Sequence, residues 1–125
     1  MSDFDVRPFV ASSSVALVER LVARVPALRP VRDEHVADNG MLLPHVCFGD
    51  VTRWVVADFE GGGEGWREVL AFLEDAYPSE GYDAQAVIEQ SLIENLPYPG
   101  QEGYGIERHL GPRLRAIYDE QRPGL

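Results

Sequence analysis

The spacing of apolar residues between positions 65 and 78 constrains this chain more than any other feature. Within GWREVLAFLEDAYP they recur every three or four residues, at Trp66, Val69, Leu70, Leu73, Ala76 and Tyr77. Such spacing places them on one face of an α-helix whose opposite face is charged. Pro78 and Gly81 then end the pattern. A helix with one apolar face must bury it against other elements, which indicates a packed helical domain.

Four further segments have helical spacing: residues 13–25, 51–59, 84–96 and 106–121. Residues that favour helix N-termini precede three of them, namely Ser12 to Ser14, Asp50 and Asp83. Gly- and Pro-rich loops between these segments are short, which favours antiparallel neighbours. We therefore expect an all-α fold, a compact bundle of about five helices in antiparallel hairpins. At 125 residues it forms a single acidic domain over 1–125.

Residues 26–49 carry a weaker pattern. VRDEHVADNG predicts a short helix that Asn39-Gly40 closes. The following MLLPHVCFG is apolar and contains Pro44, so we expect an irregular or short extended segment near 40–48. Pro44 argues against a central strand there.

The charge of the chain is concentrated in one part. The net charge is −10, and all 11 basic residues are arginines. From Asp58 to Glu107 there are 12 acidic residues and one basic residue, Arg67. Such a field repels nucleic acid and anionic membranes and attracts cationic surfaces. The structural alternative is a solvated acidic face that only keeps the protein in solution.

Location is predicted from three features. Cys47 is the one cysteine, so no internal disulfide forms, which fits a reducing compartment. The first residues carry Asp3 and Asp5 where a secretory signal needs basic residues. No apolar run reaches the roughly 20 residues that a transmembrane helix requires. We expect a cytoplasmic protein.

Catalytic and metal chemistry find little support in the sequence. The three histidines and Cys47 are scattered, so neither a zinc site nor another cofactor site is expected. Cys47 beside His45 lies in an apolar context, PHVCFG, which favours a buried, inert thiol over a nucleophile. We expect no catalytic residue and no enzyme. The alternative is a ligand-binding protein or enzyme with a pocket between helices near His45, Cys47 and Trp54.

The segment ENLPYPGQEGYG, residues 94–105, stops a helix with two prolines around a tyrosine. Tyr98 and Tyr104 lie outside the predicted helices, on a stiff bend. Such tyrosines make good interface anchors because little conformational entropy is lost on binding. The structural alternative is that a ring packs against the helical bundle and fixes the bend. Together with nearby carboxylates they suit a basic protein partner. The partner-binding candidates are Glu60, Glu64, Glu89, Glu94, Tyr98, Glu102 and Tyr104.

Three segments, LLPHVCFGDVTRWV, SLIENLPYPG and HLGPRL, resemble a family of small acidic, largely uncharacterised bacterial proteins. The resemblance spans about residues 42–115. It is loosely associated with immunity proteins of polymorphic-toxin and contact-dependent inhibition systems. It implies a non-catalytic protein that blocks a toxin, and it carries no catalytic residues. We expect a monomer or weak dimer; a domain that acts by self-association is a further alternative.

Overall fold

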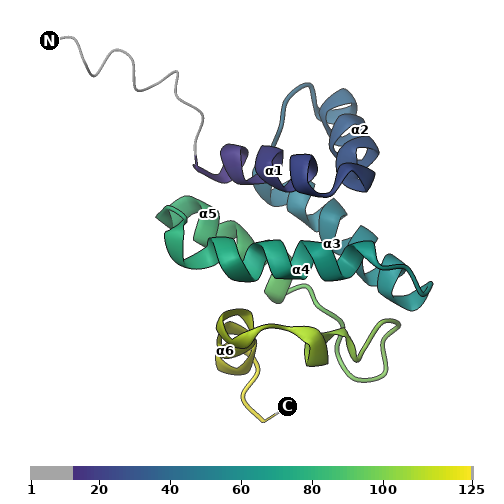
Figure 1. Ribbon diagram of the computed structural model, residues 1–125, viewed down its shortest axis with the longest axis vertical. Coiled ribbons are helices and arrows are strands. Elements are labelled where there is room, and N and C mark those ends of the chain that lie inside the picture. The colour runs from purple at the N-terminus through teal and green to yellow at the C-terminus, as the bar shows by residue number, and fades with distance from the viewer. Residues whose placement is uncertain (1–12, 125) are drawn as a thin grey trace, which may run out of the picture.

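The computed structural model describes residues 13–124, so the predicted cap residue Ser12 and the N-terminal Asp3 and Asp5 lie outside the described part. The described part contains six α-helices and no strand, which confirms the all-α prediction. Figure 1 shows α1 and α2 at one end, α4 across the middle with α3 behind it, and α6 at the other end. The α-helices are α1 (Ser13–Arg24), α2 (Arg29–Asn39), α3 (Pro44–Glu60), α4 (Gly65–Ala76), α5 (Tyr82–Val87) and α6 (Pro112–Gln121).

Short helical turns join these helices. A 3₁₀ turn, η3 (Pro26–Leu28), precedes α2, and another, η4 (Tyr77–Ser79), follows α4. A π-helical segment, η5 (Ile88–Ile93), continues α5 without a break. A final 3₁₀ turn, η6 (Ile106–His109), leads into α6. Pro112 lies in the first turn of α6, where its missing N–H group leaves no hydrogen bond unmade.

The predicted apolar faces form the core. Trp66, Val69, Leu70 and Leu73 of α4 are buried, and Ala76 and Tyr77 are half-buried. The described buried apolar residues form one cluster, which α1, α3, α4, α5–η5 and α6 all supply. Helix α3 lies at the centre, because it packs against α1, α2, α4 and η5. Buried leucines such as Leu73 hold this packing, and each contributes about 2–5 kcal/mol relative to alanine.

Two helix boundaries differ from the predictions. Residues 40–43 are irregular as expected, and Gly40, with φ of 77°, ends α2. Helix α3, however, begins at Pro44, so the irregular segment is shorter than predicted and Asp50 lies inside the helix. Proline is tolerated in the first turn of a helix because its missing N–H group has no partner there, so Pro44 begins α3 instead of interrupting it. Gly81, not Asp83, is the N-cap of α5.

Carboxylates from distant elements cap the helices. Helices α2 to α6 have no side-chain hydrogen bond from their own N-cap residue. Asp83 instead accepts a hydrogen bond of 3.1 Å from the backbone N–H of Ser14 in α1. Asp58 accepts one of 3.0 Å from Trp66 in α4. These carboxylates satisfy orphan amides and complement the positive end of each helix dipole.

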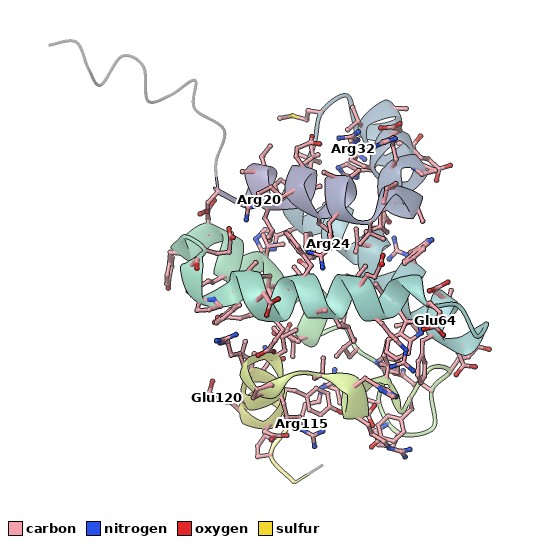
Figure 2. The ribbon with its side chains drawn as sticks, in the orientation of Figure 1. Arg20, Arg24, Arg32, Glu64, Arg115 and Glu120 are labelled. Atoms are coloured by element: carbon pink, nitrogen blue, oxygen red, sulfur yellow. The ribbon has the colours of Figure 1, made fainter. Side chains whose placement is uncertain are left out.

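The same arrangement fixes α6. The two carboxylate oxygens of Glu74 accept hydrogen bonds from the N–H groups of Arg113, at 2.8 Å, and Leu114, at 3.0 Å. A Cβ atom on Gly111 would lie 2.5 Å from the Glu74 side chain, so a larger residue there would displace this carboxylate. Figure 2 places Arg20, Arg24 and Arg32 around α1 and α2, away from Glu64 in the turn before α4. Three carboxylates of the acidic segment, Asp58, Glu74 and Asp83, thus have a structural role at helix ends.

Candidate functional site

The bend between η5 and η6 is irregular but closely hydrogen-bonded. The N–H group of Tyr98 donates to the side-chain oxygen of Gln101 at 2.8 Å, and the N–H group of Gln101 donates to the carbonyl of Tyr98 at 2.9 Å. Pro97 is buried. The Tyr98 and Tyr104 side chains remain exposed, at 47% and 37%. The bend therefore presents two aromatic rings on a fixed backbone.

Arg122 holds the start of the bend in place. Its side chain is buried and donates hydrogen bonds to the carbonyls of Leu96 at 2.7 Å, Glu94 at 3.0 Å and Pro97 at 3.1 Å. Its guanidinium carbon lies 3.8 Å from the centre of the Tyr98 ring. The cation thus complements the negative C-terminal end of η5 and stacks on an aromatic ring. No local pattern in the sequence signals this role, because the carbonyls of the bend that Arg122 contacts lie more than twenty positions away.

Glu60 fixes the other end of the bend against α3. Its carboxylate accepts a hydrogen bond of 2.9 Å from the N–H group of Gly103. Gly103 has a φ of 86°, and a Cβ atom there would lie 2.4 Å from Cγ1 of Val56. Only glycine combines this conformation with so close an approach.

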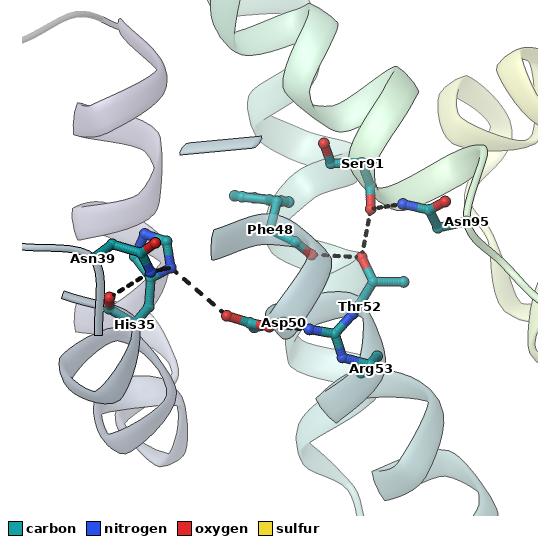
Figure 3. A network of polar contacts seen from close by, with 8 residues as sticks. All are labelled: His35, Asn39, Phe48, Asp50, Thr52, Arg53, Ser91 and Asn95. Atoms are coloured by element: carbon teal, nitrogen blue, oxygen red, sulfur yellow. Dashed lines mark hydrogen bonds and ion pairs between the residues drawn. The ribbon is translucent and has the colours of Figure 1, made fainter. Parts of the chain in front are cut away.

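The π-helical segment contributes a buried polar network next to the bend (Figure 3). The N–H group of Asn95 bonds to Leu92 at 3.1 Å, so the carbonyl of Ser91 lacks its usual helical donor. The hydroxyl of Thr52 lies 2.8 Å from that carbonyl, and the side-chain amide of Asn95 donates to it at 3.1 Å. These contacts fix Asn95 at the surface between α3 and the bend.

A groove of about 480 Å³ lies between α3 and the bend. Its α3 side is formed by Gly49, Thr52, Arg53, Val56, Ala57 and Glu60. Its other side is formed by Asn95, Pro97, Gln101 and Glu102. Charge is uneven along it, because Arg53 and the two glutamates Glu60 and Glu102 are separated by apolar residues.

The predicted partner-binding residues fall into two groups. Glu60 and Glu102 meet at the groove, and Tyr98 and Tyr104 lie on the same bend, with Glu94 exposed just before it. Glu64 and Glu89 do not line this groove. The Arg67 side chain forms an ion pair with Glu64 at 3.1 Å, and the Tyr77 hydroxyl donates a hydrogen bond to the half-buried Glu89.

Burial and Glu89 together change the titration of Tyr77. Burial is the larger cause, and the hydrogen bond to Glu89 adds to it, which raises the pKa of Tyr77 to about 12. The phenol therefore stays protonated and remains a donor at neutral pH.

The three residues of the alternative pocket, all on α3, have different surroundings. Cys47 is buried, and burial raises the pKa of its thiol to about 11, with Asp50 adding to the effect. His45 is exposed, with Nδ1 3.1 Å from the hydroxyl of Ser91. Trp54 packs over Gly65. None of the three lines the groove between α3 and the bend.

Within residues 13–124 no group of three or more His, Cys, Asp or Glu side chains is placed to hold a metal ion. None of the helices in that range combines the length and apolar character needed to cross a bilayer.

The fold and the groove define a small all-α domain with an acidic, tyrosine-bearing bend clamped by an arginine. A family model, "Domain of unknown function (DUF7674)", matches residues 18–123. The chain belongs to this family, which covers nearly all of the described helices. No curated protein and no solved structure matches the chain. The match shows a family of unknown function, and nothing links this family to immunity proteins or to the three segments on which the resemblance was based.

Proposed function

We propose that this protein is a non-catalytic binding module that holds a basic protein through the outer face of the bend. By type it is an immunity protein or antitoxin, which acts in the cytoplasm and neutralises a toxin domain. The binding surface consists of Tyr98, Tyr104, Glu94, Glu102 and Glu60. Glu64 and Glu89, which contact Arg67 and Tyr77, are not part of it.

The observation that carries this proposal is the fixed bend with two exposed tyrosines. Arg122 holds it at one end and Glu60 at the other. Binding then costs little ordering entropy, because the backbone is already in place. Tyrosine offers a large contact area and a polar hydroxyl, a combination enriched in interface anchors. Arg122 covers one face of Tyr98, so a partner contacts the rest of the ring.

The charge left over at the surface favours a basic partner. Asp58, Glu74 and Asp83 are engaged with backbone amides of other elements. Glu94 and Glu102 are exposed, and no capping contact occupies their side chains among those described. Unengaged carboxylates steer cationic surfaces toward the bend and pair with arginine or lysine.

Affinity capture with the tagged protein tests the proposal. Lysate of the source organism is applied to wild-type bait, and bound proteins are eluted with a salt gradient and identified by mass spectrometry. We expect a basic protein that elutes at lower salt from a bait with Glu94→Gln and Glu102→Gln. The matched control carries Glu34→Gln and Asp38→Asn on α2, which removes the same charge elsewhere.

The affinity of the purified partner for surface variants is the second measurement. Tyr98→Ala together with Tyr104→Ala should weaken its binding by at least about tenfold, because anchor truncations commonly cost more than 1 kcal/mol each. Equal affinity of wild type, the double glutamine variant and the double alanine variant would contradict the proposed surface.

A further inference from the structure

The groove between α3 and the bend combines apolar lining residues with carboxylates. Val56 and Ala57 line it from α3, and the buried Pro97 lines it from the bend. Its volume of about 480 Å³ lies within the range of sites that bind ligands. An aliphatic chain that lies against these residues is removed from water, which favours its binding.

The carboxylates come from both sides of the groove. Glu60 belongs to its α3 side and Glu102 to its bend side. One oxygen of Glu60 accepts the hydrogen bond from Gly103, which fixes this carboxylate and leaves its second oxygen without a donor among residues 13–124. Glu102 is exposed, and its side chain forms no ion pair or hydrogen bond within the same range. The groove therefore offers two acceptors that carry charge.

An oriented amide adds a neutral acceptor. The side-chain nitrogen of Asn95 donates to the carbonyl of Ser91, so its oxygen lies at the opposite end of the amide (Figure 3). The reverse orientation would bring two oxygens together. This contact depends on the π-helical segment, because the backbone N–H group of Asn95 bonds to Leu92 and leaves the Ser91 carbonyl for the side chain. Local π-helical geometry is frequent at functional sites.

The arginine that lines the groove is engaged by its own helix. The side chain of Arg53 forms an ion pair with Asp50, one turn earlier on α3. The charge that is left without a described counter-ion therefore comes from Glu60 and Glu102. A ligand that complements the groove has an apolar stem and a positive end.

We propose that the groove is a socket for a single arginine side chain of the basic partner. The methylene groups of this arginine lie against the apolar lining residues, and its guanidinium lies between Glu60 and Glu102. A guanidinium has five N–H donors in a planar fork, so it can bond both carboxylates and the oxygen of Asn95 together. That the arginine belongs to the partner rests on the proposed function, whereas the socket itself can be tested without a partner.

Other occupants suit the groove less well. An anionic ligand is repelled by Glu60 and Glu102. A neutral apolar ligand covers these carboxylates without pairing them, and covering an unpaired charge costs free energy. A lysine side chain brings a more strongly hydrated cation with three donors, so it loses more hydration for fewer hydrogen bonds.

An NMR titration of the purified protein with N-acetyl-arginine amide tests the socket. This probe carries the arginine side chain and no other charge. The backbone amides of Gly49, Ala57 and Gly103 and the side-chain amides of Asn95 and Gln101 report on the groove. We expect saturable shifts there, with a dissociation constant on the order of millimolar, because so small a ligand gains little binding free energy. N-acetyl-citrulline amide, in which a neutral urea replaces the guanidinium, should bind at least about fivefold more weakly.

Two variants test the shape and the charge of the socket. Ala57→Phe places a ring in the groove from an exposed position of α3 and should abolish the saturable shifts. Glu60→Gln together with Glu102→Gln removes both charges but keeps an acceptor for Gly103. This double variant should raise the dissociation constant at least about fivefold.

A matched control removes two charges outside the groove. Glu64→Gln together with Glu94→Gln changes two exposed glutamates that do not line it. The dissociation constant of the arginine probe should stay within about twofold of the wild-type value. Circular dichroism checks that each variant is folded.

Three results would overturn the socket. Groove amides of folded wild type that show no saturable shift would mean that the groove does not hold this side chain. Equal affinity for the arginine and citrulline probes would mean that the carboxylates do not recognise the charge. Equal shifts around Glu34 and Asp38 on α2 would mean that the probe only associates with acidic surface.

The socket and the proposed function can fail separately. If the arginine probe binds in the groove and capture yields no basic protein, the socket stands and the proposed function is left without its partner. If a partner is captured, Ala57→Phe should weaken its binding at least about tenfold, as an anchor truncation does. A partner whose affinity depends on Tyr98 and Tyr104 but not on Ala57→Phe binds the bend alone, and the socket is then not its site.

Discussion

Gly103 and Gly100 have nearly the same backbone conformation, with φ of 86° and 90°, in different surroundings. A Cβ atom on Gly103 would meet Val56, whereas nothing lies within 4 Å of the corresponding position on Gly100. The two glycines of one bend therefore separate two causes of glycine preference, backbone strain and close packing.

Replacing each glycine by alanine measures these causes. Gly100→Ala should lower the free energy of unfolding by about 1 kcal/mol, the cost of the left-handed conformation alone. Gly103→Ala adds the clash with Val56 and should cost about 2–4 kcal/mol in total. Urea unfolding followed by circular dichroism gives both values. Equal losses would show that the bend relaxes away from α3.

At the scale of elements, the sequence predicted helices well and their ends less well. The buried face of α4 could be predicted because the residues buried there are the apolar ones that recur at helical spacing in its sequence. The start of α3 at Pro44 differs from the prediction, because a proline among apolar residues suits both an interrupted strand and the first turn of a helix. The caps were missed for a different reason: Asp83 looks like a local N-cap, but it satisfies α1, and only the packed structure brings them together.

The contact of Asp83 with α1 gives a pH-dependent prediction. The hydroxyl of Ser13 is the main cause that lowers the pKa of Asp83, and the amide and hydroxyl of Ser14 add to it. A carboxyl with a depressed folded-state pKa stabilises the fold above its unfolded pKa, about 3.9, and loses this contribution as pH falls through the folded value. Asp83→Ala should therefore cost about 1 kcal/mol at pH 7.

The difference between wild type and Asp83→Ala should shrink as the pH is lowered below about 4. Denaturant unfolding at several pH values gives the comparison. Asp75→Ala, which removes an exposed carboxylate of α4, should change stability by no more than about 0.5 kcal/mol. A constant difference across the pH range would mean that the carboxylate charge does not stabilise α1.

For the whole molecule, counting charges does not distinguish carboxylates that hold helix ends from carboxylates that remain exposed at the surface. Sequence composition predicts a negative field from the 12 acidic residues between Asp58 and Glu107. The structure assigns several of them to helix ends, including Glu74 to α6. The candidate site shows the same limit. The exposure of its two tyrosines could be predicted from the prolines and glycines around them. The contacts of Arg122 could not, because they form only in the tertiary structure.

Cys47 reports on the integrity of the whole core. It is fully buried, and the pKa of its thiol is about 11, so the reactive thiolate is scarce at pH 8. Modification by a thiol reagent should be at least about 1,000-fold slower than that of a free cysteine, because reaction awaits opening of the fold. Labelling followed by absorbance, with and without urea, measures this rate. Rapid labelling in native buffer would show local access to Cys47.

The Arg122 contacts also set an order for assembly during synthesis. Pro97 and Arg122 are 25 positions apart, so the bend leaves the ribosome well before the arginine that holds it. The helices before the bend have all emerged by then and can begin to pack. The contacts that hold the tyrosine-bearing bend are therefore completed only after Arg122 has emerged, when the helices before the bend are already able to pack.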